Sequence, residues 1–305
     1  AEDRVPYLAG LERARDVGYR VLADGGTAVA AILAAVTTME DDLAAFNAGT
    51  GGSPNRDGVV QCDAAIMSAD GTRGAVAAVT RAKNPILLAD KVRVASPHAL
   101  IVGPGADALV EHPIDNAQLL TPRTRLALER WRESQQARPQ GSATVGAVAL
   151  DEQGEIAAAT STGGMLGKWS GRVGDAPLIG AGTYAARHVG ISCTGDGEAF
   201  IRAVTAKGLA DRLRAGVEVE TAVQLALDEV AAQNANGGLI VLRVSWPAGS
   251  TPATWPTRGA PRPGRTRACR PNPGCGGSVE ASQAVAGPRS TRRSCLSSPA
   301  ASPLR

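Results

Sequence analysis

Apolar residues recur at helical spacing in several segments of this chain. Val29, Ile32, Leu33 and Val36 follow the i, i+3, i+4, i+7 rule, and Thr27 in front of them can act as a helix N-cap. The other predicted helices show similar spacing of their apolar positions. They cover residues 8–23, 84–94 and 126–135, a segment with Phe200, Ile201 and Val204 on its inner side, and a segment from Val219 to Val230.

Short apolar runs between glycine-rich or polar turns predict β-strands. They cover residues 59–67, 74–80, 144–150, 156–162, 189–193 and 239–244. The polar turn at 151–155 joins two of these strands into a predicted hairpin. If Leu150 pairs with Ile156, Thr144 lies opposite Thr162, with Cβ atoms about 5 Å apart. The hairpin would therefore bring two threonine hydroxyls within hydrogen-bond reach at its open end.

Composition limits the class of protein. The chain has 305 residues, of which 44% are hydrophobic, so it can bury a large core. It has no apolar run of about 18 residues that would predict a membrane span, and its N-terminus lacks the pattern of a signal peptide. We therefore expect a soluble, cytoplasmic protein in which Cys62 and Cys193 are buried, reduced thiols and not part of a zinc site.

Charge and proline are distributed unevenly along the chain. The net charge is +3, but residues 246–305 carry nine arginines, one glutamate and ten of the nineteen prolines, which leaves the body at −5. The tail at 246–305 has too few apolar residues to offset the entropy of ordering, so it is predicted to be disordered. The body divides at Thr144 into residues 1–143, which end in a polar linker at 113–143, and residues 144–245.

Two glycine-rich turns carry the candidate chemistry. Gly195 and Gly197 lie in a turn that opens a helix, where unpaired backbone N–H groups can stabilise an oxyanion. Arg172 can bind a carboxylate through two parallel hydrogen bonds, and Asp175 can pair with an ammonium group. Spacing alone favours plainer alternatives, namely a surface Arg–Asp pair and an ordinary strand-to-helix turn. A phosphate-binding loop at 163–168 is rejected, because the run is one residue too short.

Several longer motifs occur in a fixed order along the chain. They are Phe46 to Gly49, Cys62 to Ala64, Asn84 to Ile86, Thr144 to Asp151, Thr160 to Met165, Gly171 to Pro177, Gly180 to Ala185 and Ser192 to Arg202. In this order and spacing they closely resemble the isoaspartyl peptidase/L-asparaginase family, the plant-type asparaginases among the N-terminal nucleophile hydrolases. The resemblance covers roughly residues 8–242.

The resemblance implies an α+β fold, a four-layer αββα sandwich of the N-terminal nucleophile hydrolase type. It also implies a precursor that cuts itself between Ala143 and Thr144. Thr144 would then be the nucleophile, with its freed α-amine as the base. By the same matching, Thr162 hydrogen-bonds and positions the nucleophile, and Asn47 lies beside it.

Further roles are implied in the same way. Thr194 and Gly195 would form the oxyanion hole. Arg172 would bind the substrate α-carboxylate, while Asp175 and the carbonyl of Gly197 would hold its ammonium group. No cofactor is required, but the family often carries a structural sodium ion, which backbone carbonyls would hold here. Those carbonyls belong to Phe46, Ala48 and Thr50.

The implied reaction is hydrolysis of L-asparagine to aspartate and ammonia, of β-aspartyl dipeptides, or of both, by a dimer of αβ heterodimers. No specific nucleic-acid partner and no membrane partner are expected. The run Thr160-Ser-Thr-Gly-Gly favours this activity over that of the glycosylasparaginases, which resemble Thr-Ser-Thr-Asn-Gly there.

Three departures from the family pattern leave an alternative. A first strand ending in a His-Gly-Gly-Ala-Gly-like loop is missing, Ala143 stands where glycine is usual, and the tail replaces a C-terminal strand and helix. The chain would then be an impaired or unprocessed relative whose basic tail binds anions without specificity.

Overall fold

The computed structural model describes residues 5–134, 144–245 and 278–286. The helices are α1 (Val5–Ala23), α2 (Ala28–Glu40), α3 (Pro85–Ala95), α4 (Gly103–Asp107), the 3-10 turn η2 (Asn116–Gln118), α5 (Pro122–Ser134), α6 (Gly197–Ala203), α7 (Thr205–Arg214) and α8 (Val219–Ala231). The strands are β1 (Cys62–Ser68), β2 (Arg73–Val79), β3 (Leu100–Val102), β4 (Val145–Leu150), β5 (Ile156–Thr162), β6 (Thr183–Ala186), β7 (Val189–Gly195), β8 (Gly237–Ser245) and β9 (Ser278–Ala286). The predicted mixture of helices and strands is confirmed.

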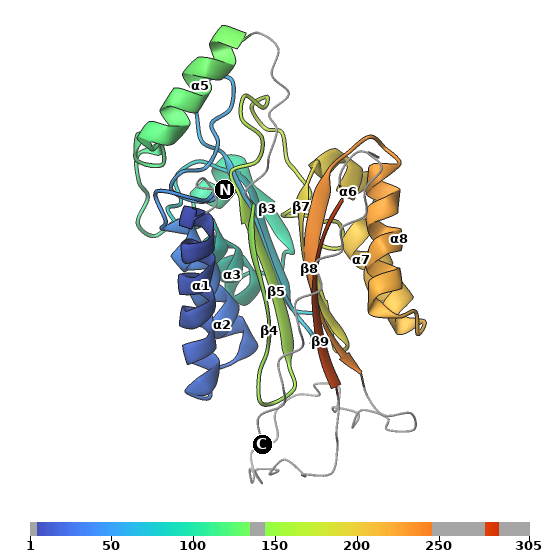
Figure 1. Cartoon of the computed structure of the whole chain (residues 1–305). Helices are drawn as coiled ribbons and strands as arrows, with labels where there is room; N and C mark the ends of the chain where they lie inside the picture. The colour runs from blue at the N-terminus through green and yellow to red at the C-terminus, as the bar shows by residue number, and fades with distance from the viewer. Residues whose placement is uncertain (1–4, 135–143, 246–277, 287–305) are drawn as a thin grey trace.

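The strands form two sheets that pack against each other. One sheet has the order β3-β2-β1-β5-β4, and the other has the order β6-β7-β8-β9. Figure 1 shows α1, α2 and α3 outside the first sheet and α6, α7 and α8 outside the second. Contacts of β4 and β5 with β6 and β7 join the two sheets.

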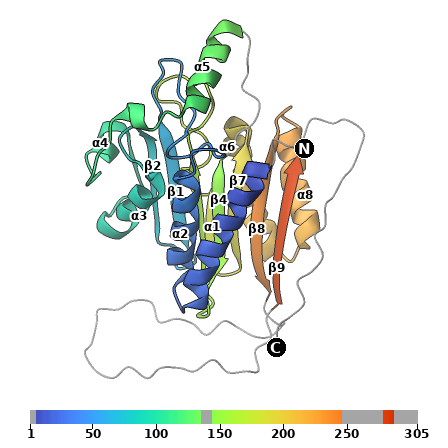
Figure 2. The same ribbon diagram turned by 60° about the vertical axis from the view of Figure 1, so that its left-hand side comes forward.

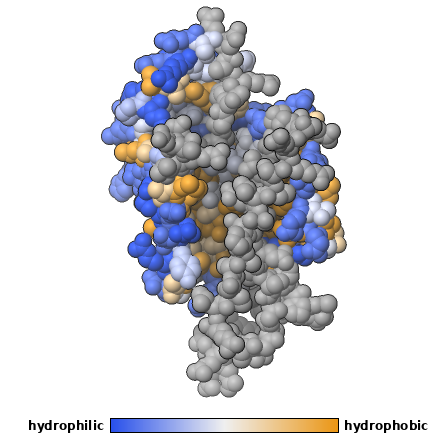
Figure 3. Space-filling model, viewed as in Figure 1, coloured by the Kyte–Doolittle hydropathy of each residue, from blue (hydrophilic) through white to orange (hydrophobic). Residues whose placement is uncertain are grey.

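The buried apolar residues follow this arrangement. One large cluster lies between the first sheet and its helices, and a second lies between the other sheet and α6 to α8. A small cluster around Ala158 lies between the sheets. On the face shown in Figure 3, hydrophilic residues cover the outer parts of the molecule, and hydrophobic residues gather toward the middle. The sheets therefore form the interior of the molecule.

Glycines allow the two sheets to approach closely. A Cβ on Gly146 would lie 2.0 Å from Ser192 Oγ, and a Cβ on Gly190 would lie 3.5 Å from Val148 Cβ. Position 146 of β4 thus faces position 192 of β7, and position 148 faces position 190. The two strands therefore cross the interface in opposite directions, so the start of β4 lies near the end of β7.

Local predictions hold where the sequence pattern was strongest. Thr27 caps α2, since its hydroxyl accepts a hydrogen bond from the Ala30 N–H at 3.2 Å. The hairpin has the predicted register, with Leu150 opposite Ile156. Strong periodicity and a short polar turn were sufficient to fix both features.

Elsewhere, the structure differs from the sequence prediction. Strand β6 was not predicted. The helix expected through Val204 is divided into α6 and α7, because Val204 adopts a left-handed conformation with φ 47° and ends α6. The helix near 126–135 begins earlier, at Pro122, inside the stretch predicted as a linker. Residues 135–143 of that linker lie outside the described residues.

The tail was predicted to be disordered, and this is wrong for residues 278–286. They form β9, which pairs antiparallel with β8 from Ser278 opposite Ser245 to Ala286 opposite Gly237. Figure 2 shows β9 beside β8 at the edge of the sheet. The edge of β8 offers backbone N–H and C=O groups that a further strand can pair with. The other residues of 246–305 lie outside the described part of the chain.

Two predictions from composition can be compared with the structure. Cys62 and Cys193 are buried free thiols, as predicted, and burial raises the pKa of Cys62 to about 12. Among the described helices, none is long and apolar enough to span a lipid bilayer.

Candidate active site

Thr144 and Thr162 form the centre of the candidate site, at the open end of the β4–β5 hairpin. Thr144 Oγ1 donates a hydrogen bond to Thr162 Oγ1 at 3.0 Å, so the predicted contact is confirmed. Thr162 is 4% exposed and also accepts a hydrogen bond from the Gly164 N–H at 3.0 Å. Thr144 is only half-buried, which leaves part of it accessible. The predicted cleavage partner, Ala143, lies outside the described residues.

Asn47 acts on this pair through the loop that follows β5. Its Nδ2 donates to the Gly164 carbonyl at 2.7 Å, and its Oδ1 accepts from the Ser53 N–H at 2.6 Å. The Asn47 carbonyl accepts from the Gly163 N–H at 2.8 Å. Because Gly164 also donates to Thr162, a buried Asn47 fixes the backbone that holds the Thr162 hydroxyl.

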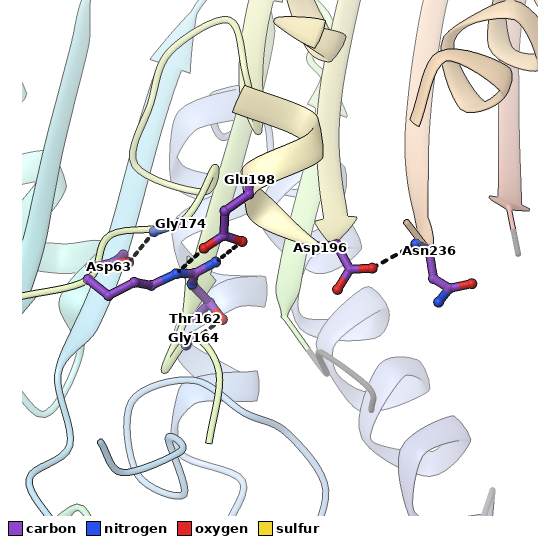
Figure 4. A network of polar contacts seen from close by, with 8 residues as sticks. Asp63, Thr162, Gly164, Gly174, Asp196, Glu198 and Asn236 are labelled. Atoms are coloured by element: carbon purple, nitrogen blue, oxygen red, sulfur yellow. Dashed lines mark hydrogen bonds and ion pairs between the residues drawn. The ribbon is translucent and has the colours of Figure 1, made fainter. Parts of the chain in front are cut away.

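Arg172 forms its ion pair with Glu198. Its Nε donates to Glu198 Oε1 at 2.9 Å, and its Nη2 donates to Oε2 at 2.7 Å, which is a two-point contact. The Arg172 side chain is 17% exposed, whereas that of Glu198 is 62% exposed. In Figure 4, Glu198 extends from α6, and the dashed lines that end on its carboxylate mark this two-point contact. This pair differs from the Arg172–Asp175 surface pair that spacing alone favoured.

Asp175 is a buried carboxyl group whose hydrogen-bonding capacity is only partly used. It is 7% exposed, and within the described segments its Oδ2 has no hydrogen-bond partner. Burial raises the pKa of Asp175 to about 7, and the Arg172 guanidinium opposes that rise. Buried polar atoms are nearly always hydrogen-bonded in folded proteins. An ammonium ligand would supply the missing donor.

Thr194 and Gly195 end β7 on the side of the sheets where β4 begins. The crossing of β4 and β7 brings Thr194 to the same end of the molecule as Thr144. Gly195 has φ 149°, and a Cβ there would lie 2.3 Å from the Asn236 carbonyl oxygen, so only glycine fits. The next residue, Asp196, accepts the Asn236 N–H at 2.8 Å (Figure 4). This contact fixes the turn that leads into α6.

Two buried charged groups support the site, and the sequence motifs gave neither of them a role. Asp63 lies opposite Thr162 in the β1–β5 ladder, and its Oδ2 accepts the Gly174 N–H at 3.2 Å (Figure 4). Burial raises the pKa of Asp63, and Lys168 opposes that rise. Lys168 is 5% exposed and donates to the Gln61 carbonyl at 2.6 Å. Burial lowers the pKa of Lys168. The sequence signal that could have identified Asp63 was a single acidic residue within an apolar strand.

Glu40 is a third buried group that sequence reasoning missed. It is 0% exposed, and its Oε1 accepts hydrogen bonds from Ser161 Oγ at 2.6 Å and from the Ile86 N–H at 3.0 Å. Burial raises the pKa of Glu40 to about 8. Since Ser161 precedes Thr162 in β5, Glu40 joins the end of α2 to the end of the hairpin.

The loop predicted to hold sodium contains Phe46, Ala48 and Thr50, which are all buried. The Phe46 carbonyl accepts a hydrogen bond from Arg123 Nη2 at 2.8 Å, and the Gly51 carbonyl accepts from the same nitrogen at 3.2 Å. A guanidinium cation therefore already binds two carbonyls of this loop. A sodium ion would share the Phe46 oxygen with a positive charge, so this loop fits sodium poorly.

Comparisons with known proteins identify the family of this chain. A family model described as asparaginase matches residues 1–254. The chain is 41% identical over 262 residues to an isoaspartyl peptidase/L-asparaginase of Mus musculus. This alignment covers 81% of this chain and 79% of the relative. The chain is 40% identical over 250 residues to a plant-type L-asparaginase of Pyrococcus horikoshii (74% of this chain, 79% of the relative). It is 35% identical over 261 residues to an isoaspartyl peptidase of Escherichia coli (79% and 80%). The predicted resemblance is confirmed, and the chain belongs to the asparaginase family of hydrolases.

Proposed function

We propose that this chain is a self-processing threonine amidohydrolase that cleaves L-asparagine or β-aspartyl dipeptides. The observation that carries the proposal is the 3.0 Å contact between the Thr144 and Thr162 hydroxyls at the start of β4, in a member of the asparaginase family. The finer description of the fold belongs to the same proposal. It is a four-layer αββα sandwich, with residues 1–143 and 144–245 as the two parts of a precursor.

Self-cleavage would use the hydroxyl of Thr144. Its oxygen attacks the carbonyl of Ala143, the C–N bond breaks, and an ester forms between the two residues. Water hydrolyses this ester and leaves Thr144 with a free α-amine. The hydroxyl and amine of one residue then supply both nucleophile and base, so no histidine is needed. Thr162 supports this role because its hydroxyl is fixed from two sides.

Hydrolysis of the substrate would repeat this chemistry on a side-chain amide. The Thr144 oxygen attacks the amide carbonyl, and the oxyanion is stabilised at Thr194 and Gly195. The amine leaves with a proton from the α-amine, and water then hydrolyses the β-aspartyl ester. Every step uses groups of the chain itself, so the proposal involves no cofactor.

Recognition of an amino acid would depend on two charged groups. Arg172 can bind an α-carboxylate in the two-point manner in which it now binds Glu198. Asp175 can bind the α-ammonium group with its Oδ2, which has no hydrogen-bond partner in the described part of the chain, helped by the carbonyl of Gly197. These two contacts select a small zwitterion, and a dimer of αβ heterodimers is part of the same proposal.

The test is intact mass spectrometry of the purified full chain during prolonged incubation, followed by assays with L-asparagine and a β-aspartyl dipeptide. We expect two fragments that divide between Ala143 and Thr144, and hydrolysis once they form. Thr144→Ala should stay whole, whereas Thr72→Ala, in an exposed turn, should be cut like wild type. A wild-type chain that stays whole and inactive would contradict the proposal and support the impaired relative.

A further inference from the structure

We propose that Glu198 is a specificity-determining residue, an internal carboxylate that competes with the substrate α-carboxylate for Arg172. This inference rests on the proposed function, because it assumes that Arg172 binds the substrate. It assigns to Glu198 a role that neither the sequence motifs nor the catalytic steps above require.

Glu198 contacts Arg172 in the way in which a bound carboxylate ligand would. Glu198 reaches Arg172 Nε and Nη2 with one oxygen each, at 2.9 Å and 2.7 Å. Planar two-point contacts of this kind are how arginine recognises carboxylates in general. A carboxylate of the protein thus uses the hydrogen bonds that the proposed function gives to a carboxylate of the substrate.

The two partners differ in how firmly they are held. Arg172 is mostly buried, and its guanidinium lies against three glycines. A Cβ would lie 3.5 Å from Nη1 at Gly164, 3.0 Å from Nη1 at Gly174 and 2.9 Å from Nη2 at Gly197. Glu198 is 62% exposed. Its side chain can move into solvent at little cost, whereas the guanidinium stays in place.

Binding of a second carboxylate to Arg172 must weaken the first contact. A substrate carboxylate either takes the Nε and Nη2 face and displaces Glu198, or binds the other face beside it. In the second case, two negative groups share one guanidinium and repel each other. Both routes oppose the binding of substrate.

Glu198 also affects the second recognition group. The Glu198 carboxylate contributes to raising the pKa of Asp175, while Arg172 opposes the rise. When Glu198 moves away, the ionised form of Asp175 becomes more favourable. A substrate α-carboxylate that takes the place of Glu198 at Arg172 brings an equal negative charge, so this gain for Asp175 is offset and the cost of displacing Glu198 remains. A ligand without an α-carboxylate leaves the Glu198–Arg172 pair intact and pays no cost of displacement, so Glu198 selectively weakens the binding of complete amino acids.

The experiment compares wild type, Glu198→Gln and Glu220→Gln, the last removing an exposed carboxylate from the first turn of α8. KM and kcat for L-asparagine and the inhibition constant of L-aspartate are measured. In Glu198→Gln, we expect KM and the inhibition constant to fall roughly two- to fivefold, as for loss of a partly exposed ion pair. The value of kcat should change less than twofold, and Glu220→Gln should match wild type.

A KM that is unchanged or raised in correctly folded Glu198→Gln would overturn the inference, since Glu198 would then be neutral or would position Arg172. Asparagine α-amide, which lacks the carboxylate, should gain clearly less affinity from the substitution than L-asparagine does, and an equal gain would also overturn it. If wild type hydrolyses no substrate, the proposed reaction is wrong, but the inference about Glu198 can still be tested. Calorimetry then measures the affinity of wild type and of Glu198→Gln for L-aspartate. Tighter binding to Glu198→Gln supports the inference, and equal or absent binding overturns it.

Discussion

The threonine pair and the two charged residues Arg172 and Asp175 belong to one candidate site, but they are stabilised in different ways. The hydroxyls of Thr144 and Thr162 are neutral, and they are joined to each other and to the adjacent Gly164 N–H. Arg172, by contrast, forms an ion pair with the exposed Glu198, and one oxygen of the buried Asp175 has no hydrogen-bond donor within the described residues. The hydroxyl contacts at the hairpin end are therefore complete without a ligand, whereas Asp175 lacks the donor that an ammonium group would supply.

The largest expected effect comes from removing the hydroxyl groups of the threonine pair. Thr144→Ala should abolish self-cleavage and lower kcat by about 10⁴-fold or more, because nucleophile and base are lost together. Thr162→Ala should lower kcat by about 10²-fold through loss of one fixed hydrogen bond. Rates of self-cleavage and of asparagine hydrolysis measure both effects. Recovery in Thr162→Ser is the control, and an unimpaired Thr162→Ala would show that the hydroxyl contact has no role.

Removing the charge of Asp175 should raise KM more than it lowers kcat. Asp175→Asn keeps the shape of the side chain but loses the charge that would hold the substrate ammonium. We expect KM for L-asparagine to rise by about 10²-fold, the range for losing one partner of a buried charge pair. Steady-state kinetics on the processed protein give KM and kcat separately. A fall in kcat at unchanged KM would instead assign Asp175 to the chemical step.

The pH dependence of KM provides a finer test of the role of Asp175. The pKa of Asp175 is raised to about 7 by burial, so the carboxyl group gains a proton as pH falls through 7. Only the ionised form attracts an ammonium group. KM should therefore be nearly constant above pH 8 and rise about tenfold at pH 6. Asp175→Asn should lose this dependence, and a KM that is flat from pH 8 to 6 in wild type would contradict the assignment.

Glu40 tests how strongly the hairpin end depends on buried polar contacts. Its folded-state pKa of about 8 lies above the ordinary value of 4.5, so its stabilising contribution is full below pH 4.5 and is lost as pH rises through 8. Relative to Glu40→Gln, the free energy of unfolding of wild type should fall by a few kcal/mol over that range. Urea denaturation at several pH values measures this difference. Glu12→Gln, on the exposed face of α1, is the control.

The smallest expected effect concerns the loop that contains Asn47. Because Arg123 binds the Phe46 and Gly51 carbonyls, the Tm of wild type should be the same in sodium chloride and in choline chloride. Arg123→Gln should cost about 1 kcal/mol, which lowers Tm by roughly 2–4 °C, and sodium should restore part of this loss. A wild-type Tm that falls when sodium is replaced would instead support the predicted sodium site.

The threonine pair could be predicted from the sequence because it depends only on neighbouring strands. A hairpin with a short polar turn has one plausible register, and the side-chain period of two then fixes which residues face each other. The contact between Thr144 and Thr162 followed from this register. The cap of α2 followed from the helical spacing of the apolar residues behind Thr27. The family motifs added candidate roles for Arg172 and Asp175, but not their contacts.

The contacts of the charged residues were decided only by the tertiary structure. Glu198 meets Arg172 from a different element, and Asp63 meets Gly174 across 111 positions of the chain. No periodicity encodes such pairs, because they depend on how two sheets pack. Strand β9 was also decided by contacts between distant segments. Its composition predicted disorder, but pairing with the edge of β8 outweighed this tendency. The sequence by itself determined the local elements and the hydroxyl pair, and only packing between distant segments decided where the charges lie.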